Sequence, residues 1–179
     1  MNELGNRLYE LARSAGALLL EQRLMLVTAE SCTAGGIAFA VTQIPGSSSW
    51  FDRGAVVYSN DAKQRMLGVS TVYLRDFGAV SEPVAREMAL GALQHSVAQV
   101  AIAVTGIAGP DGGTEEKPVG TVCFAWALRR DATGVPWVRT RTKRFDGDRA
   151  AVRTQSIVES LEELCRLLRH REDERAPGP

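Results

Sequence analysis

The stretch "LMLVTAESCTAGGIAFAV", Leu24 to Val41, joins two different patterns. Its first residues are apolar and predict a short buried strand at 24–29. Gly35 and Gly36 open a segment, 35–44, whose apolar spacing predicts a helix that ends at Pro45-Gly46. A strand that passes through a turn of small and hydroxyl residues into a helix is typical of α/β folds. The turn itself has three interpretations: a nucleophile, a phosphate-binding turn or a plain connection.

The bulk composition is that of a globular protein. The chain has 179 residues, of which 45% are hydrophobic and 23% are charged, and this length is sufficient for a substantial core. We expect a single domain over 1–170 and a disordered tail over 171–179. The formal net charge is zero, which argues against a surface built to bind nucleic acid.

The cysteines and the apolar runs indicate the cellular compartment of the protein. Cys32, Cys123 and Cys165 are far apart in the sequence and have no metal-ligand spacing, so we expect reduced thiols in a cytoplasmic protein. The first sixteen residues lack the apolar core of a signal peptide. No apolar run approaches the roughly 18 residues that suggest a membrane span.

Strands and helices alternate along the rest of the chain. Apolar spacing predicts an opening helix whose inner face carries Leu4, Leu8, Leu11, Ala15 and Leu18. Further strands are predicted at 54–59, 100–106, 121–128 and 137–145. Further helices are predicted at 60–68 with Asn60 as the N-cap and Gly68 as the stop, at 81–95, and after an Asp148 cap. This order predicts an α/β sandwich, and the closeness of the last two strands predicts a mixed sheet.

Three segments follow predicted strands and combine small residues with hydroxyl groups. They are "AESCTAGG" (29–36), "YSNDAK" (58–63) and "VTGIAGPDGG" (104–113). Sites in open α/β sheets form beyond the carboxyl ends of the strands, and glycines there let backbone N–H groups approach a ligand closely. We therefore expect the functional site where these segments meet.

Ser31 has two competing interpretations. At a strand-to-helix turn its hydroxyl could attack a carbonyl carbon while nearby N–H groups stabilise the oxyanion. Ser31 or Thr33 could equally act only as the helix cap, which is the more common role for such a residue. The segment has neither the spacing of a P-loop nor that of a hydrolase nucleophile elbow.

A serine nucleophile needs a base, and histidine is a poor candidate here. His95 and His170 both lie far from the glycine-rich segments in the sequence, so neither a Ser-His-acid triad nor a histidine metal site is supported. Lys63 follows the strand that ends near Tyr58, and burial beside the site would lower its pKa enough for it to act as a base. A solvated surface lysine is the alternative. Tyr58 is either a hydrogen-bonding or stacking group, or an ordinary half-buried tyrosine.

Other residues near these segments have weaker functional interpretations. Cys32 is a rival nucleophile, although a small buried residue is the commoner fate of a free cysteine. Glu30 could orient a neighbour or pair with a cation. The basic residues that could meet an anionic substrate, or be plain surface groups, are Lys117, Arg149 and Arg153.

Five segments, in order along the chain, resemble the CinA C-terminal-domain family. They are "TAESCTAGG", "IPGSSSWFDRGAVVYSNDAKQRMLGV", "GAVSEPVAREMALGAL", "VTGIAGPDGGTEEKPVGTVCFA" and "FDGDRAAVR". Each is weak alone, but five in order are specific, and the resemblance runs from about Leu4 to Leu168. One mild departure is Ala34, where many relatives carry glycine.

The resemblance implies a fold and a reaction. The family fold is a three-layer α/β/α sandwich around a mixed, mostly parallel sheet, often in a homodimer, with no metal or cofactor. Its characterised members are nicotinamide-nucleotide amidohydrolases, which hydrolyse the carboxamide of nicotinamide mononucleotide within pyridine-nucleotide recycling. Many relatives carry a second, N-terminal domain, and we expect the short stand-alone form here.

The resemblance also implies site residues. The family's serine/lysine pair falls on Ser31 and Lys63, with Tyr58 in support. The expected substrate or oxyanion contacts are Cys32, Thr33, Gly35, Gly36, Asn60, Thr105, Gly106, Ala108, Gly109 and Arg149, the last as a phosphate contact.

Two alternative functions remain. One is a nucleotide-binding module without turnover, and the other is a DNA-associated competence factor.

Overall fold

The stretch 24–41 folds as a strand, a turn and a helix, as its pattern predicts. Strand β1 (Leu26–Glu30) is buried along its whole length, and helix α2 (Gly36–Thr42) follows the turn. The computed structural model describes residues 3–129 and 134–173. Within these ranges β1 is the centre of the parallel part of the sheet, because it pairs with a parallel strand on each side.

The sheet has five strands in the order β2-β1-β3-β4-β5. The pairings of β1 with β2 and β3 are parallel, whereas β3 with β4 and β4 with β5 are antiparallel. The predicted mixed sheet is therefore confirmed, with its parallel pairs confined to one half. The bounds of the other strands are β2 (Phe51–Val56), β3 (Val100–Gly106), β4 (Thr121–Leu128) and β5 (Trp137–Arg144).

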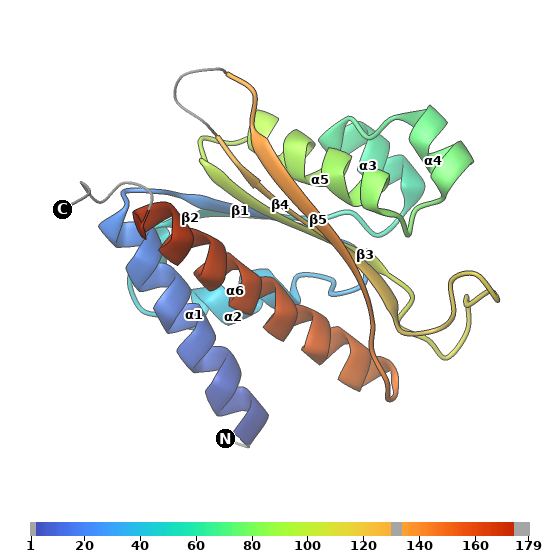
Figure 1. Ribbon diagram of the computed structural model, residues 1–179, viewed down its shortest axis with the longest axis horizontal. Helices are drawn as coiled ribbons and strands as arrows, with labels where there is room; N and C mark the ends of the chain where they lie inside the picture. Colours follow the sequence, from blue (N-terminus) through green and yellow to red (C-terminus); the bar gives the residue numbers. More distant parts are fainter. Residues whose placement is uncertain (1–2, 130–133, 174–179) are drawn as a thin grey trace.

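Helices cover both faces of the sheet, which gives the three layers that the resemblance implies (Figure 1). One layer contains α1 (Glu3–Glu21), α2 and the long α6 (Arg149–Asp173). The opposite layer contains α3 (Asn60–Leu67), α4 (Thr71–Phe77) and α5 (Glu82–Gln94). A short 3₁₀ turn at Ser47–Ser49 precedes β2.

Strand β4 shows how the two faces of the sheet differ. Its large side chains, Phe124 and Trp126, are buried on the α1/α2/α6 side. Its small ones, Cys123 and Ala125, are buried on the α5 side. Residues that alternate along a strand point to opposite faces. One face of β4 therefore carries large side chains, and the other carries small ones, against which a helix can pack closely.

Helix α5 also packs tightly against α3. A Cβ at Gly91 of α5 would lie 1.9 Å from the Leu67 carbonyl oxygen.

Several boundaries differ from the sequence predictions. The predicted strand 54–59 lies three residues earlier, at Phe51–Val56, because its register with β1 decides where it pairs. The N-cap of α3 is Ser59, whose hydroxyl accepts from the Ala62 N–H, and not Asn60. Helix α4 was not predicted.

The predicted helix caps elsewhere are confirmed. Gly68 ends α3 in a left-handed conformation, and the Asp148 carboxylate accepts from the Ala151 N–H at 2.8 Å. Helix α6 continues through Asp173, so 171–173 are helical, and the rest of the predicted tail lies outside the described residues. No helix in the ranges described combines the length and apolar character needed to cross a membrane.

Candidate active site

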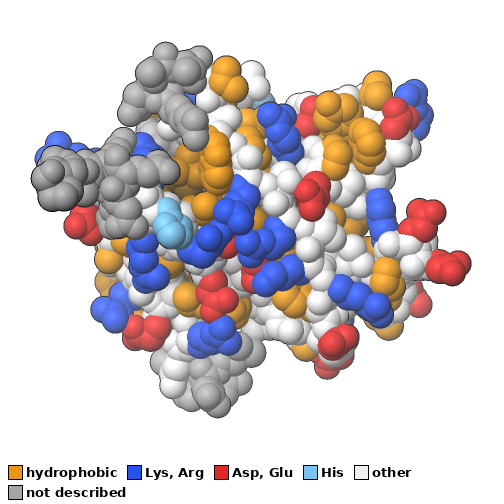
Figure 2. Space-filling view, viewed as in Figure 1, with side chains coloured by type: hydrophobic (Ala, Val, Ile, Leu, Met, Phe, Trp, Pro, Cys, Tyr) orange, Lys and Arg blue, Asp and Glu red, His pale blue; other side chains and the backbone are white. Residues whose placement is uncertain are grey.

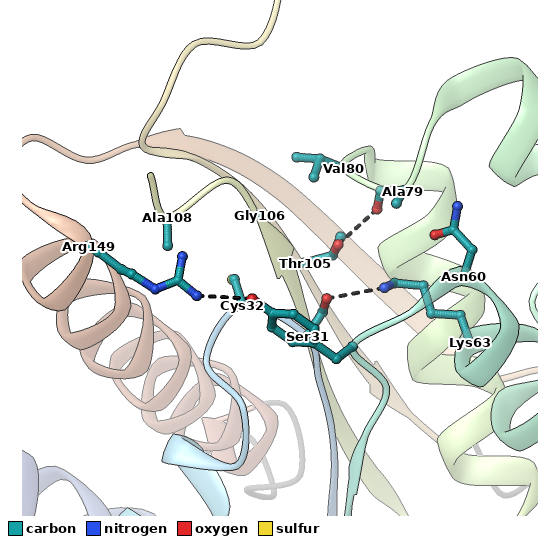
Figure 3. Close-up of a pocket in the computed structure, with 11 residues that line it drawn as sticks. Ser31, Cys32, Asn60, Lys63, Ala79, Val80, Thr105, Gly106, Ala108 and Arg149 are labelled. Carbon is teal, nitrogen blue, oxygen red and sulfur yellow. Dashed lines mark hydrogen bonds between the residues drawn. The ribbon is translucent and has the colours of Figure 1, made fainter. Parts of the chain in front are cut away.

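The three predicted segments meet at the carboxyl edge of the parallel strands. Ser31 follows β1, Tyr58 follows β2 and Thr105 lies at the end of β3. A cavity of about 190 Å³ opens between them (Figure 3). It is lined by Ser31, Cys32, Tyr58, Asn60, Lys63, Ala79, Val80, Thr105, Gly106, Ala108 and Arg149. Because β1 lies between β2 and β3, this edge is a topological switch point, where ligands bind in open α/β sheets.

Lys63 contacts Ser31 directly. Its Nζ lies 3.1 Å from the Ser31 Oγ and donates to the Val57 carbonyl oxygen at 3.0 Å. The Lys63 side chain comes from the first turn of α3 and is only 2% exposed, and Ser31 is 7% exposed. Both side chains point into the same cavity (Figure 3). The lysine is therefore not the solvated surface group that was the alternative.

The environment of Lys63 favours its neutral form. Burial away from water lowers the pKa of Lys63 below its ordinary value of 10.5, and a smaller contribution from Cys32 acts in the opposite direction. No carboxylate contributes to this shift. An amine whose charged form is disfavoured can accept a proton from an adjacent hydroxyl.

Cys32 is placed and protonated in a way that disfavours it as a nucleophile. Its side chain is 5% exposed, and a Cβ on Gly106 would lie 3.1 Å from its Sγ. Burial raises the pKa of the Cys32 thiol to about 12, and it outweighs the nearby backbone N–H groups, which act in the opposite direction. The thiol is therefore neutral near pH 7, and the thiolate is the nucleophilic form of cysteine.

Glu30, and neither Ser31 nor Thr33, caps helix α2. Its buried carboxylate accepts from the N–H groups of Ile37 and Ala38, each at 2.9 Å. It also accepts from the Thr28 hydroxyl at 3.1 Å. The free donors that we expected at this helix start are thus occupied by a side chain of the protein. Glu30 also pairs with no cation in any ion pair among the described residues.

Thr33, Gly35 and Gly36 do not line the cavity, in contrast to the expectation. Thr33 is fully buried, and its carbonyl oxygen accepts from Arg153 at 3.0 Å. Gly36 faces α6, because a Cβ there would lie 2.5 Å from Ile157. These residues shape the turn and lie outside the cavity lining. Ala34 has a left-handed φ of 50°, a conformation that glycine adopts more readily than alanine.

Two backbone N–H groups remain beside Ser31. In the described part of the chain, the Cys32 N–H donates to no oxygen. The Ile107 N–H donates to the Thr121 carbonyl oxygen, so these two residues form a hydrogen-bonded pair at the end of the β3–β4 ladder. Hydrogen-bonded and non-hydrogen-bonded pairs alternate along an antiparallel ladder, so the next pair, Gly106 and Val122, is a non-hydrogen-bonded one. Its N–H therefore points away from β4, toward the turn that carries Ser31. These two groups are the candidate oxyanion donors.

Arg149 links two walls of the cavity. Its guanidinium donates to the Tyr58 hydroxyl at 3.0 Å and to the Gly109 carbonyl oxygen at 2.8 Å. Gly109 is therefore a support for Arg149 and does not line the cavity itself. Tyr58 is 61% exposed, and its hydroxyl contacts Arg149, not the serine.

The cavity also has a wall that sequence reasoning missed, formed by Ala79 and Val80. These side chains carry no reactive group, so only their place in "GAVSEP", between two helices, could have pointed to them. Thr105 anchors this wall, since its hydroxyl donates to the Ala79 carbonyl oxygen at 2.8 Å (Figure 3). Across the described ranges, no group of three or more His, Cys, Asp and Glu side chains could hold a metal ion.

Comparison with known proteins agrees with this architecture. The model of the CinA C-terminal domain matches residues 8–168. The chain belongs to the CinA C-terminal domain family. It is 53% identical over 160 residues to the nicotinamide-nucleotide amidohydrolase PncC of Enterobacter agglomerans, covering 89% of this chain and 94% of that protein.

Two further proteins are similar to this chain. The nicotinamide-nucleotide amidohydrolase PncC of Escherichia coli (strain K12) is 50% identical over 159 residues, covering 89% of this chain and 93% of that protein. The crystal structure of competence/damage inducible protein CihA from Agrobacterium tumefaciens is 47% identical, with a TM-score of 0.83, and covers 90% of this chain and 95% of that chain. The CinA fold therefore extends over nearly all of the described residues.

Proposed function

We propose that this CinA-family protein is an amidohydrolase that converts nicotinamide mononucleotide to nicotinate mononucleotide and ammonia. The observation that carries the proposal is the 3.1 Å contact between the buried Lys63 amine and the Ser31 hydroxyl. The names of two relatives, at 53% and 50% identity, supply the substrate class. A pair of this kind needs neither histidine nor an acid to activate the serine.

The first step is attack on the carboxamide. The neutral Lys63 amine takes the proton of the Ser31 hydroxyl as the Oγ forms a bond to the carboxamide carbon. The carbonyl oxygen becomes an oxyanion, which the N–H groups of Cys32 and Gly106 stabilise by hydrogen bonds. The Val57 carbonyl oxygen keeps the Lys63 amine in place, so that one N–H is occupied and the lone pair is free to face Ser31.

The second step releases ammonia. The protonated Lys63 gives its proton to the amide nitrogen, the C–N bond breaks, and an ester between Ser31 and the nicotinoyl group remains. Water then attacks this ester with Lys63 again as the base, which restores the serine and yields the carboxylate. Since the same group acts as acid and base, each proton is returned within one turnover.

The phosphate group of the nucleotide is recognised at the mouth of the cavity. Arg149 is the exposed cation there, and a guanidinium suits the oxygens of a phosphate group. Its contacts with Tyr58 and Gly109 hold it at the rim. We also propose, from the family, that the protein acts in the cytoplasm as a homodimer in pyridine-nucleotide recycling. The free, buried state of all three cysteines is compatible with a reducing compartment.

An ammonia-release assay on four compounds tests the proposal: the mononucleotide, its riboside, free nicotinamide and the dinucleotide. We expect the highest kcat/KM for the mononucleotide, with nicotinate mononucleotide formed in equal amount to ammonia. Saturable binding of the mononucleotide without any acid product would instead indicate a binding module. Tight, salt-sensitive binding to DNA would indicate the competence-related alternative.

A further inference from the structure

The wall of the cavity between α4 and α5 is fixed through its carbonyl groups. We call residues 77–80 the α4–α5 wall. The Phe77 carbonyl oxygen accepts from the Lys117 Nζ at 2.6 Å. The next two carbonyl oxygens accept from the Ser81 hydroxyl at 2.9 Å and from the Thr105 hydroxyl at 2.8 Å. Three side-chain donors therefore fix three successive peptide groups that lead into the cavity lining.

Lys117 differs from the other two donors because it comes from the loop that carries Ala108. It does not itself line the cavity. It lies on the long loop 107–120 between β3 and β4. The neck of this loop is closed by hydrogen bonds from Gly120 N–H to Ile107 and from Ile107 N–H to Thr121. Its tip is closed by Thr114, which exchanges hydrogen bonds with Lys117 at 2.9 and 3.0 Å. Lys117 thus projects from a defined turn.

The same loop is attached on its other side by Arg149, through the Gly109 carbonyl oxygen. Ala108, which lines the cavity, lies beside that attachment. Two cations therefore attach the loop: Arg149 of α6 binds its Gly109 carbonyl oxygen, and the loop's own Lys117 binds the Phe77 carbonyl oxygen of the α4–α5 wall. Removing the Lys117 side chain would break the hydrogen bond between the loop and the Phe77 carbonyl oxygen and leave the Arg149 contact with Gly109 in place.

We propose that Lys117 is a positioning residue, which holds loop 107–120 against the α4–α5 wall and so fixes Ala79 and Val80 against the bound nucleotide. Ser31 and Lys63 are held by β1 and α3, through contacts that do not involve Lys117. Loss of the tether therefore weakens substrate binding more than it slows the chemical step. The expected changes in KM and kcat rest on the proposed function.

The test compares Lys117→Met with Lys117→Arg, whose guanidinium can donate to the same carbonyl, and with the control Lys143→Met. Lys143 pairs with Glu159 on α6, away from the cavity lining. For Lys117→Met we expect KM for the mononucleotide to rise about 10-fold, as for loss of one charge-assisted hydrogen bond, with kcat within about 2-fold. Lys117→Arg should recover most of this loss, and Lys143→Met should leave KM unchanged.

Amide hydrogen exchange supplies a readout that needs no turnover. Faster exchange at residues 77–81 in Lys117→Met, with the thermal midpoint kept, supports the tether. Unchanged KM and unchanged exchange would overturn it, and so would a fall in kcat at constant KM. If the wild type releases no ammonia, the proposed function fails on its own, while the exchange comparison still decides the role of Lys117.

Discussion

At the scale of single residues, the protonation state of Lys63 controls the proposed reaction. Its pKa lies below 10.5 because burial disfavours the charged amine. The neutral amine is the base, so activity is lost as the pH falls through that lowered pKa and is gained as it rises. We expect kcat/KM to increase with pH along a single ionisation whose apparent pKa is below 10.5. A pH–rate profile measured with Ser31 intact checks this directly.

Lys63→Arg separates the positive charge of Lys63 from its role as a base. A guanidinium stays charged throughout the usable pH range and cannot accept the serine proton. We expect kcat to fall by at least about 10³-fold, comparable to removing a general base outright. Lys63→Met should lose activity to a similar extent. A variant Lys63→Arg with more than a tenth of wild-type kcat would show that charge, not proton transfer, is what Lys63 supplies.

Tyr58 and Arg149 form a second residue-scale comparison. The Tyr58 hydroxyl contacts Arg149 and not Ser31, so Tyr58→Phe should change kcat by less than about 5-fold. Arg149→Met removes the cation at the cavity rim, and we expect KM for the mononucleotide to rise about 10-fold or more. Steady-state kinetics with the riboside gives the control, since a substrate without phosphate should be affected less. A larger kcat loss in Tyr58→Phe than in Arg149→Met would contradict these assignments.

The sequence pointed to the reactive residues and to most of the cavity lining, but not to the wall that Ala79 and Val80 form. Ser31 and Lys63 could be singled out because histidine is scarce and because Lys63 follows a strand in one of three converging segments. Thr33 and Gly36 were misplaced, since the direction of a tight turn depends on contacts with Glu30 and α6 that no local pattern contains. Ala79 and Val80 are ordinary apolar residues, and only the tertiary structure brings them to the cavity.

At the scale of elements, the contact between α3 and α5 sets the position of Lys63. A Cβ at Gly91 would come within 1.9 Å of the Leu67 carbonyl oxygen at the end of α3. Gly91→Ala must therefore push α3 away from α5, and with it the amine that contacts Ser31. We expect a loss of about 3 kcal/mol or more in the free energy of unfolding and a fall in kcat.

Urea denaturation and kinetics of Gly91→Ala check this expectation. Gln94→Ala, an exposed change on the same helix, is the matched control and should change stability by less than about 0.5 kcal/mol. If Gly91→Ala were as stable and as active as the wild type, the close packing of α3 on α5 could not be what places Lys63.

Elements with strong local patterns were predictable, and short ones were not. β3 and β4 begin and end where their apolar runs do, because both are buried along nearly their whole length. α4 has only seven residues, with Leu74 its single buried side chain, so it has no apolar periodicity to detect. The start of α3 was predicted one residue late, because Ser59 and Asn60 are both good caps and only the backbone conformation distinguishes them.

At the scale of the whole molecule, a charged network connects the edge of the sheet to α6. Figure 2 shows Lys and Arg side chains gathered over α6 and β5 in the middle of one face. Beneath them, Glu163 is nearly buried and pairs with Arg139 at 3.2 Å, with Arg141 at 3.3 Å and also with Arg166. Glu159 pairs with Arg141 and Lys143 at 2.8 and 2.5 Å. This network helps to fix the middle of α6 against β5.

Glu163 makes this network sensitive to acid. Burial alone would raise the pKa of Glu163, but the Arg166 hydrogen bond and the charges of Arg141, Arg166 and Arg139 outweigh it and hold the pKa below 4.5. The stabilisation is therefore present above about pH 4.5 and is lost as the pH falls through the lowered pKa. Glu163→Gln should lose about 1–3 kcal/mol at pH 7, with a smaller difference from wild type under acid conditions.

Unfolding by urea between pH 7 and pH 3 measures this difference. The control is Glu162→Gln on the same helix, where the side chain is 40% exposed and its carboxylate pairs with Arg7. Its effect should stay within about 1 kcal/mol at every pH, as for other exposed ion pairs. An equal pH dependence of the two variants would mean that the buried network contributes nothing specific to the acid stability.

The strand order explains why the site lies where it does in the whole molecule. β1 is flanked by β2 and β3, so the segments that follow these three parallel strands leave the sheet at one edge, and α6 and the α4–α5 wall close the cavity from opposite layers. In the proposed reaction, Ser31 in this cavity is the nucleophile. Ammonia release from nicotinamide mononucleotide, measured side by side for the wild type and Ser31→Ala, decides this assignment. We expect equal amounts of ammonia and nicotinate mononucleotide from the wild type and a loss of at least about 10³-fold in Ser31→Ala. Undiminished release by Ser31→Ala would show that another group is the nucleophile.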